Sequence, residues 1–201
     1  MKSENKYIGD DKFAKLLEHY KCPMPVCVVK ARFIGSICSP NLDLRPTDVI
    51  SSFWEEGRSP RLETKEEADL FFKFFMGAWD EAFEQIKKNN IKLSSFKNNQ
   101  ESLKEICRQR YDEIEWGFVE GFWGGKEDLK IPAYIAEIID SLSDIAEVYQ
   151  TLLKKLDKDD CDVEKIASTI HHSDRMVEKA LSFIIENSVL PRIESLKREV
   201  N

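Results

Sequence analysis

Apolar residues recur every three or four positions along most of the chain, a period that is typical of amphipathic α-helices. The clearest example is residues 64–88, where Thr64 and Glu67 have the spacing of a capping box. The apolar face that follows comprises Ala68, Phe71, Phe72, Phe75, Trp79, Ala82, Phe83 and Ile86. This wide face predicts a long helix that packs in the core against more than one neighbour.

The same period predicts further helices on both sides of this segment. A short helix over Phe13–Tyr20, capped by Asp10 or Asp11, is followed by one that begins near Pro25 and ends at Pro40, and by a short one that starts near Pro46. Longer helices are expected over residues 103–123, 132–156 and from 163 to Pro191, which should break or kink the last. No hairpin signal is present. We therefore expect an all-α, single-domain bundle of about six to seven helices over residues 1–201, with 188–201 as a charged C-terminal tail.

The stretch EIEWGFVEGFWGGK, residues 113–126, has an unusual composition for a helix. A phosphate-binding loop is excluded, because Glu120 stands where its first glycine belongs and Glu127 where a hydroxyl residue is needed. A membrane segment is disfavoured, since Glu113, Glu115 and Glu120 would be costly in lipid. Helix packing remains as the explanation.

Gly117 and Gly121 lie on one helical face, where the absence of side chains lets another helix approach closely. Each glycine costs roughly 1 kcal/mol of helix propensity relative to alanine, so close contacts must offset that cost. We predict helix-packing roles for Gly117, Gly121, Trp116, Phe118 and Phe122. Two other tryptophans, Trp54 and Trp123, are candidates for contact with a partner protein, because large aromatic side chains are favoured in interfaces.

Composition and charge narrow the classes of function. With 42% hydrophobic and 33% charged residues the chain is typical of a globular protein, and its net charge of −7 disfavours nucleic acid as a partner. The lysines at 87, 88, 92 and 97 leave weak nucleic-acid binding as an alternative. Five cysteines, a polar N-terminus and no long apolar run together predict a cytoplasmic protein without a membrane segment.

No motif for metal binding or catalysis is present. His171 and His172 are adjacent, so on a helix they point about 100° apart and do not share an ion easily. An acidic stretch that starts at Asp157 lacks the glycine and the glutamate of a calcium loop. Cys38 or Cys107 could meet His19 in space, but nothing selects such a pair. We expect no cofactor, no metal and no enzymatic activity, although an enzyme with a site assembled from scattered residues remains an alternative.

Four segments, in order, resemble the YecA/YgfB family of bacterial proteins: FIGSICSPNLDLRPTDVISSFWEE, ETKEEADLFFKFFMGAWDEAF, WGFVEGFWGG and EIIDSLSDIAEVYQ. The resemblance covers about residues 12–187. It departs from the family where HHSDRMVEKAL replaces a Glu-Tyr-Val-Arg segment of YgfB-like members, and no Cys-rich metal module follows Pro191. The resemblance implies an all-helical fold, a homodimer and no established enzymatic activity. We therefore expect a non-catalytic protein-interaction or regulatory module whose partner is an unidentified protein.

Overall fold

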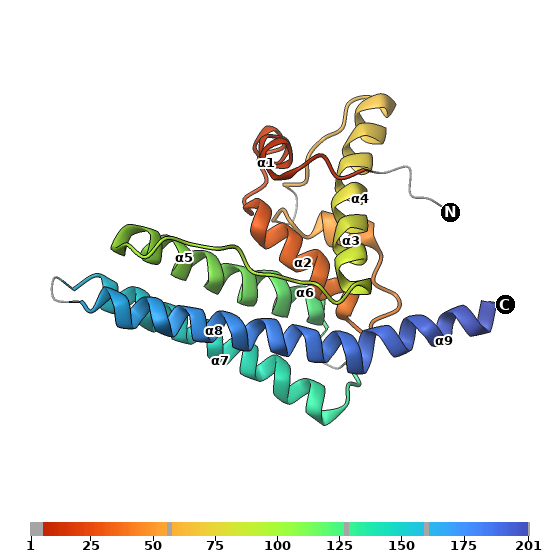
Figure 1. The fold of residues 1–201 in the computed structure, drawn as a ribbon. Coiled ribbons are helices and arrows are strands. Elements are labelled where there is room, and N and C mark those ends of the chain that lie inside the picture. The colour runs from red at the N-terminus through yellow and green to blue at the C-terminus, as the bar shows by residue number, and fades with distance from the viewer. Residues whose placement is uncertain (1–5, 56–57, 127–128, 159–160, 201) are drawn as a thin grey trace.

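The computed structural model describes residues 6–55, 58–126, 129–158 and 161–200. These residues form an all-helical domain with no strand among them (Figure 1). Helices that follow one another without interruption make seven rods in the described part of the chain, which confirms the predicted all-α bundle.

The N-terminal half contributes four separate helices, and their ends follow local sequence signals. They are α1 (Asp10–His19), α2 (Val26–Cys38), α3 (Pro46–Ser51) and α4 (Lys65–Lys87). Pro25 is the N-cap of α2, and Thr64 caps α4 by accepting the Glu67 N–H at 3.1 Å. The cap predicted for α1 is wrong. Gly9 occupies the N-cap, because the Asp10 side chain instead accepts from Tyr7 Oη and Lys30 Nζ.

The C-terminal half consists of three long rods. The first runs through α5 (Gln100–Asp112), the π-helical η1 (Glu113–Val119) and α6 (Glu120–Trp123). The second is α7 (Ala133–Leu156), and the third runs through α8 (Val163–Ile184), the π-helical η2 (Ile185–Val189) and α9 (Leu190–Val200). In Figure 1 the helices α5, α7 and α8 lie alongside one another and form one group. Helix α4 stands across this group, and α2 lies between α4 and the group.

Pro191 does not end the last helix. The Leu190 N–H donates to Ile185 O, five residues earlier, so a π-helical turn precedes the proline and the helix continues to Val200. A wider turn of this kind relieves the clash that a proline ring makes with the preceding turn of an α-helix. The predicted tail is thus helical as far as residue 200, while Asn201 lies outside the described residues.

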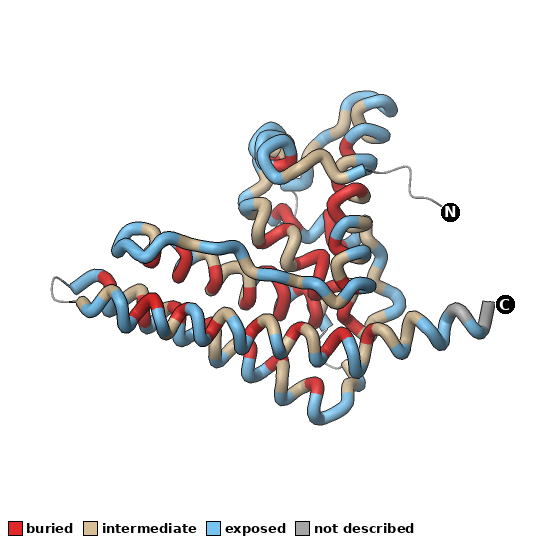
Figure 2. The backbone as a smooth tube through the Cα atoms, viewed as in Figure 1, coloured by how far each residue is buried: buried red, intermediate tan, exposed pale blue. Residues whose placement is uncertain are grey.

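The buried residues, red in Figure 2, come from both the N-terminal and the C-terminal helices and form one continuous core. Trp54 belongs to this core: it is 6% exposed and its Nε1 donates to Tyr20 O at 3.0 Å. Its ring lies among those of Phe53, Phe71 and Phe75. The prediction that Trp54 contacts a partner is therefore wrong, since its ring is covered by the chain's own aromatic residues.

No helix in the described ranges is both long and apolar enough to cross a membrane.

Candidate functional site

Two helices approach closely at the seam between α2 and the rod formed by η1 and α6. A Cβ built on Gly117 would lie 2.6 Å from Ala31 Cβ, and one on Gly121 would lie 3.0 Å from Arg32 Cα. Gly35 of α2 completes the seam, because a Cβ there would overlap the carbonyl of Phe118. The glycine spacing predicted the close approach, but the third glycine was missed because it lies on the other helix.

A buried arginine holds the π-helical turn of this seam. The Glu120 N–H donates to Glu115 O, five residues back, rather than to the carbonyl of Trp116. Arg32, which is 7% exposed, donates to that Trp116 carbonyl from Nε at 3.0 Å and Nη2 at 2.7 Å. Burial lowers the pKa of Arg32, while the negative charge of Glu120 raises it. The arginine thus replaces a hydrogen bond that the wider turn removes.

Trp116 is an exposed residue, although its own carbonyl belongs to the seam. The residue is 53% exposed, so its predicted packing role is wrong: the buried part is its backbone. Phe118 and Phe122 are buried as predicted, at 4% and 1% exposure. Trp123 is half-buried and its ring packs against Phe122 at 5.6 Å between ring centroids.

Acidic residues flank Trp116 along its helix. Glu115 precedes it, and Asp112 and Glu120 lie one turn before and one turn after it. Burial raises the pKa of Asp112. We call Trp116 with Asp112, Glu115 and Glu120 the Trp116 face.

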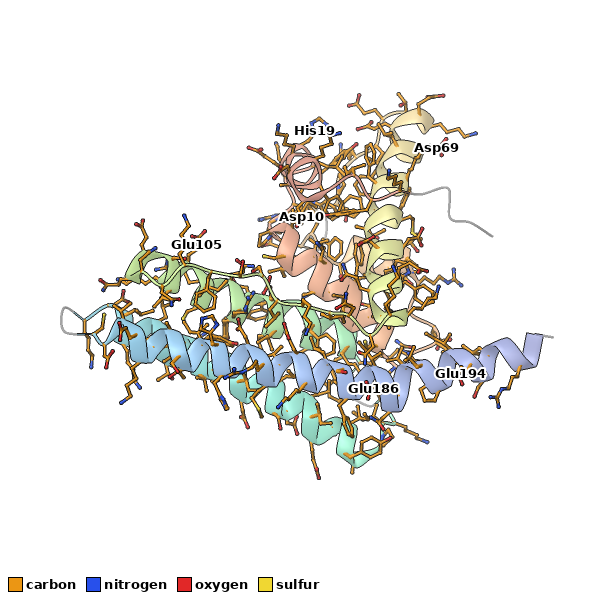
Figure 3. The ribbon with its side chains drawn as sticks, in the orientation of Figure 1. Asp10, His19, Asp69, Glu105, Glu186 and Glu194 are labelled. Atoms are coloured by element: carbon orange, nitrogen blue, oxygen red, sulfur yellow. The ribbon has the colours of Figure 1, made fainter. Side chains whose placement is uncertain are left out.

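A separate cavity of about 210 Å³ lies on the other side of the seam, between α2, η1, α8 and the non-helical segment 88–99. Its apolar lining comprises Ala31, Ile34, Ile91, Leu93, Ile114, Phe118, Leu142, Val177 and Leu181. Its polar lining comprises Asp10, Cys27, Lys30, Gln85, Lys92, Ser94, Gln109 and Glu113. Asp10 and Lys92 are exposed, so the cavity opens to solvent beside them; Asp10 is seen above α2 in Figure 3.

The segment 88–99 forms one wall of the cavity, and a row of polar residues on α8 and the start of η2 holds it. The row is Asp174, Glu178, Ser182 and Glu186, spaced four residues apart, and Glu186 is labelled in Figure 3. Glu178 accepts from Lys92 Nζ at 2.8 Å and from the Leu93 N–H at 3.1 Å. Asn89 donates to Ser182 Oγ at 2.8 Å and also to Glu186. The segment has no regular secondary structure, and side chains of a helix distant in the sequence fix its position.

At the end of that row a buried arginine joins four parts of the fold. Arg110, which is 0% exposed, donates to Glu113 Oε2 at 2.7 Å, to Asp174 Oδ1 at 3.1 Å and to both oxygens of Ser94. Tyr149 Oη donates to Asp174 Oδ1 at 2.7 Å. Burial, followed by the charge of Asp174, raises the pKa of Tyr149, so the phenol stays protonated and keeps donating. The spacing of apolar residues did not reveal this cluster.

The other residues that the sequence analysis named lie away from the seam and the cavity, or already form ion pairs. Lys87 pairs with Glu84 at 2.6 Å and Lys92 with Glu178 at 2.8 Å, while Lys88 and Lys97 are exposed. These pairings leave only part of the predicted lysine patch for a nucleic acid.

The histidines and cysteines are also dispersed. His171 stacks on Phe96 at 4.5 Å, and His172 is exposed. Cys38 and Cys107 are buried, and neither makes a hydrogen bond with His19, which is exposed at the end of α1 (Figure 3). No group of three or more potential metal ligands comes together among the residues that the structure describes. Within the predicted acidic turn, Asp159 and Asp160 lie outside those residues.

Comparisons with protein-family models, with curated protein sequences and with solved structures found no match. The resemblance to the YecA/YgfB family stays a prediction from the sequence.

Proposed function

We propose that this chain is a non-catalytic, YecA/YgfB-like interaction module that binds a basic protein partner through the Trp116 face. The observation that carries the proposal is an exposed tryptophan residue, 53% accessible, whose backbone belongs to the closely packed seam.

Rigidity of the backbone favours this role for Trp116. Its carbonyl is held by Arg32, and the glycine directly after it lies against Ala31. Ordering a mobile side chain on binding costs about 0.5–1.5 kcal/mol, and a rigid support reduces such costs. Tryptophan is also enriched among the few residues that dominate the binding energy of interfaces.

The charge of the Trp116 face favours a partner that is not a second copy of the chain. Asp112, Glu115 and Glu120 would meet their own equivalents across a two-fold axis, and like charges in contact are unfavourable. A basic rim around an apolar pocket would complement them. The homodimer that the resemblance implies would then use another surface, and it stays a prediction that light scattering can check.

A cytoplasmic location is part of the proposal. All five cysteines are free in the structure, which fits a reducing compartment.

The test compares Trp116→Ala with Leu42→Ala. Leu42 is 71% exposed and lies outside the Trp116 face, so its truncation is the matched control. Proteins retained from lysate by the wild type are identified, and the affinity of each purified partner is measured by calorimetry. We expect Trp116→Ala to weaken binding by about 2 kcal/mol, roughly 30-fold, and Leu42→Ala to leave it unchanged. Added salt should slow association with a basic partner. Unchanged affinity for every partner in the Trp116→Ala variant would refute the proposal, and turnover of a metabolite in a substrate screen would favour the enzyme alternative.

A further inference from the structure

The cavity behind segment 88–99 is distinct from the Trp116 face and has the size of a small-molecule site. Its volume is about 210 Å³. A dry cavity of about 150 Å³ lined by Leu, Ile and Phe binds benzene, so this cavity can hold a ligand with roughly one more small ring. Side chains from α2, η1, α7 and α8 supply its apolar lining, which would cover the body of such a ligand.

Every charged group on the lining already has a counter-ion. Lys30 pairs with Asp10 at 3.0 Å, and both line the cavity. Lys92 pairs with Glu178 at 2.8 Å, and Glu113 pairs with Arg110 at 2.7 Å. An ionised ligand would lose its hydration without gaining an unpaired opposite charge, which costs free energy. The lining therefore favours an uncharged ligand.

Two glutamine side chains on the lining offer hydrogen-bond acceptors. Gln109 Nε2 donates to Glu113 Oε1 at 2.7 Å and to Ser94 Oγ at 3.4 Å, and Gln85 Nε2 donates to Glu81 Oε1 at 3.4 Å. Among the described residues, none donates to the amide oxygen of Gln85 or of Gln109. A ligand that carries one N–H or O–H donor would complement an acceptor of this kind.

The wall formed by residues 91–94 is fixed before any ligand arrives. Its contacts are the Leu93 N–H with Glu178 at 3.1 Å, the Lys92–Glu178 ion pair and the hydrogen bonds of Ser94 with Arg110. A preformed wall lowers the entropy cost of binding.

We propose that this cavity binds a small uncharged molecule with an apolar body and a single hydrogen-bond donor, of the size of indole or phenol. The geometry makes it a second site, independent of the Trp116 face.

The thiol of Cys27, which lines the cavity and is half-buried, reports its occupancy. The full-length protein is treated with N-ethylmaleimide at pH 8, with and without indole, and modification of each cysteine is followed by mass spectrometry. We expect indole to slow modification of Cys27 at least fivefold. Cys22 does not line the cavity and is also half-buried, so its rate should stay unchanged and serve as the internal control.

A pair of variants separates binding from reactivity. In nuclear magnetic resonance titrations with indole, Cys27→Ser should retain the wild-type shifts, and Cys27→Trp, which fills the mouth, should lose them. Val177→Phe, which fills the cavity from α8, is a second blocking variant whose fold is checked by circular dichroism. Trp116→Ala should bind indole like the wild type, because it does not line the cavity.

Three outcomes would overturn the proposal. One is the absence of shifts and of Cys27 protection at millimolar indole. Another is equal binding of ionised indole-3-carboxylate, which contradicts the argument from paired charges. The third is retention of indole binding by both filled variants in their folded state.

Discussion

At the scale of single residues, three glycines allow the helices to approach closely, and two arginines donate hydrogen bonds to backbone carbonyls of these helices. Gly35, Gly117 and Gly121 remove side chains where a Cβ would overlap the facing helix. The buried Arg32 and the half-buried Arg192 bring their guanidinium groups to the carbonyls of Trp116 and Ile37. A guanidinium group stabilises a carbonyl that lacks a hydrogen bond within its own helix, whereas an apolar side chain offers no donor.

Gly35→Ala should be strongly destabilising. The new Cβ would overlap the backbone of Phe118 and lie 2.9 Å from Phe122 N, and a backbone cannot move aside as a flexible side chain can. Because the overlap is with backbone, we expect an overpacking cost at the upper end of about 1–3 kcal/mol. The gain of about 1 kcal/mol in helix propensity offsets part of it, which leaves a net loss of about 2 kcal/mol in the free energy of unfolding. Urea denaturation measures it, with Ser168→Ala on the exposed side of α8 as the control. A Gly35→Ala variant as stable as the wild type would contradict the close approach.

The two fully buried thiols should be unreactive in the native protein. Burial raises the pKa of Cys38 and of Cys107 to about 12, from an ordinary value near 9. The raised values mean that these neutral thiols stabilise the fold below about pH 9, and that this contribution is lost as the pH rises towards 12. At pH 8.5 we expect alkylation of the half-buried Cys161 but not of these two, and of all five cysteines in urea, as followed by mass spectrometry. Modification of native Cys38 at the rate of Cys161 would contradict its burial.

At the scale of elements, the polar row on α8 and η2 fixes the position of the non-helical segment 88–99, which forms a wall of the cavity. Residues 88–99 form no regular secondary structure before α5 begins at Gln100, so their order depends on side chains of another element. The two π-helical turns change local helix geometry. One brings the Trp116 carbonyl within hydrogen-bonding distance of Arg32, and the other accommodates Pro191.

Glu178→Ala should loosen the wall without unfolding the bundle. The change removes the ion pair with Lys92 and the hydrogen bond to the Leu93 N–H. We expect hydrogen exchange of the Leu93 amide to speed up about tenfold or more, while amides of α7 keep their rates, because loops open with lower free energies than cores. Glu137→Ala, on the exposed side of α7, is the matched control. Equal exchange at Leu93 in both variants would show that the row does not hold the wall.

At the scale of the whole molecule, one core unites the two groups of helices. Buried residues from Phe13 to Val189 form a single cluster, and Arg110 ties α5 and segment 88–99 to α8 through its contacts with Asp174 and Ser94. Arg192 adds a bond from α9 to the end of α2, at 2.9 Å from the Ile37 carbonyl.

A continuous core predicts one cooperative unfolding transition. Tryptophan fluorescence reports on the surroundings of Trp54, Trp79, Trp116 and Trp123, and far-UV circular dichroism reports on all helices. We expect the two urea midpoints to coincide. Arg110→Met should lower both midpoints together, by an amount equivalent to about 3–5 kcal/mol, because it leaves the carboxylates of Asp174 and Glu113 without their counter-ion. Separate transitions for the two probes would mean that one part of the fold unfolds on its own.

Much of the fold could be predicted from short-range patterns. The capping residues Pro25 and Thr64, the apolar period of α4 and α7, and the paired glycines at 117 and 121 each act through neighbours within a few positions. The sites could not be predicted in the same way. The exposure of Trp116 depends on a π-helical turn, and the cavity depends on where segment 88–99 crosses α8.

The sequence by itself determined that the chain is all-helical and which helix would carry the close contact, because hydrophobic period and glycine spacing are properties of one local segment. Only the tertiary structure decided that Trp54 is covered and Trp116 exposed, and that Arg110 meets Asp174 across 64 positions. The physical reason is that exposure and charge pairing depend on which other helix covers a residue, and neighbours in the sequence do not specify that partner.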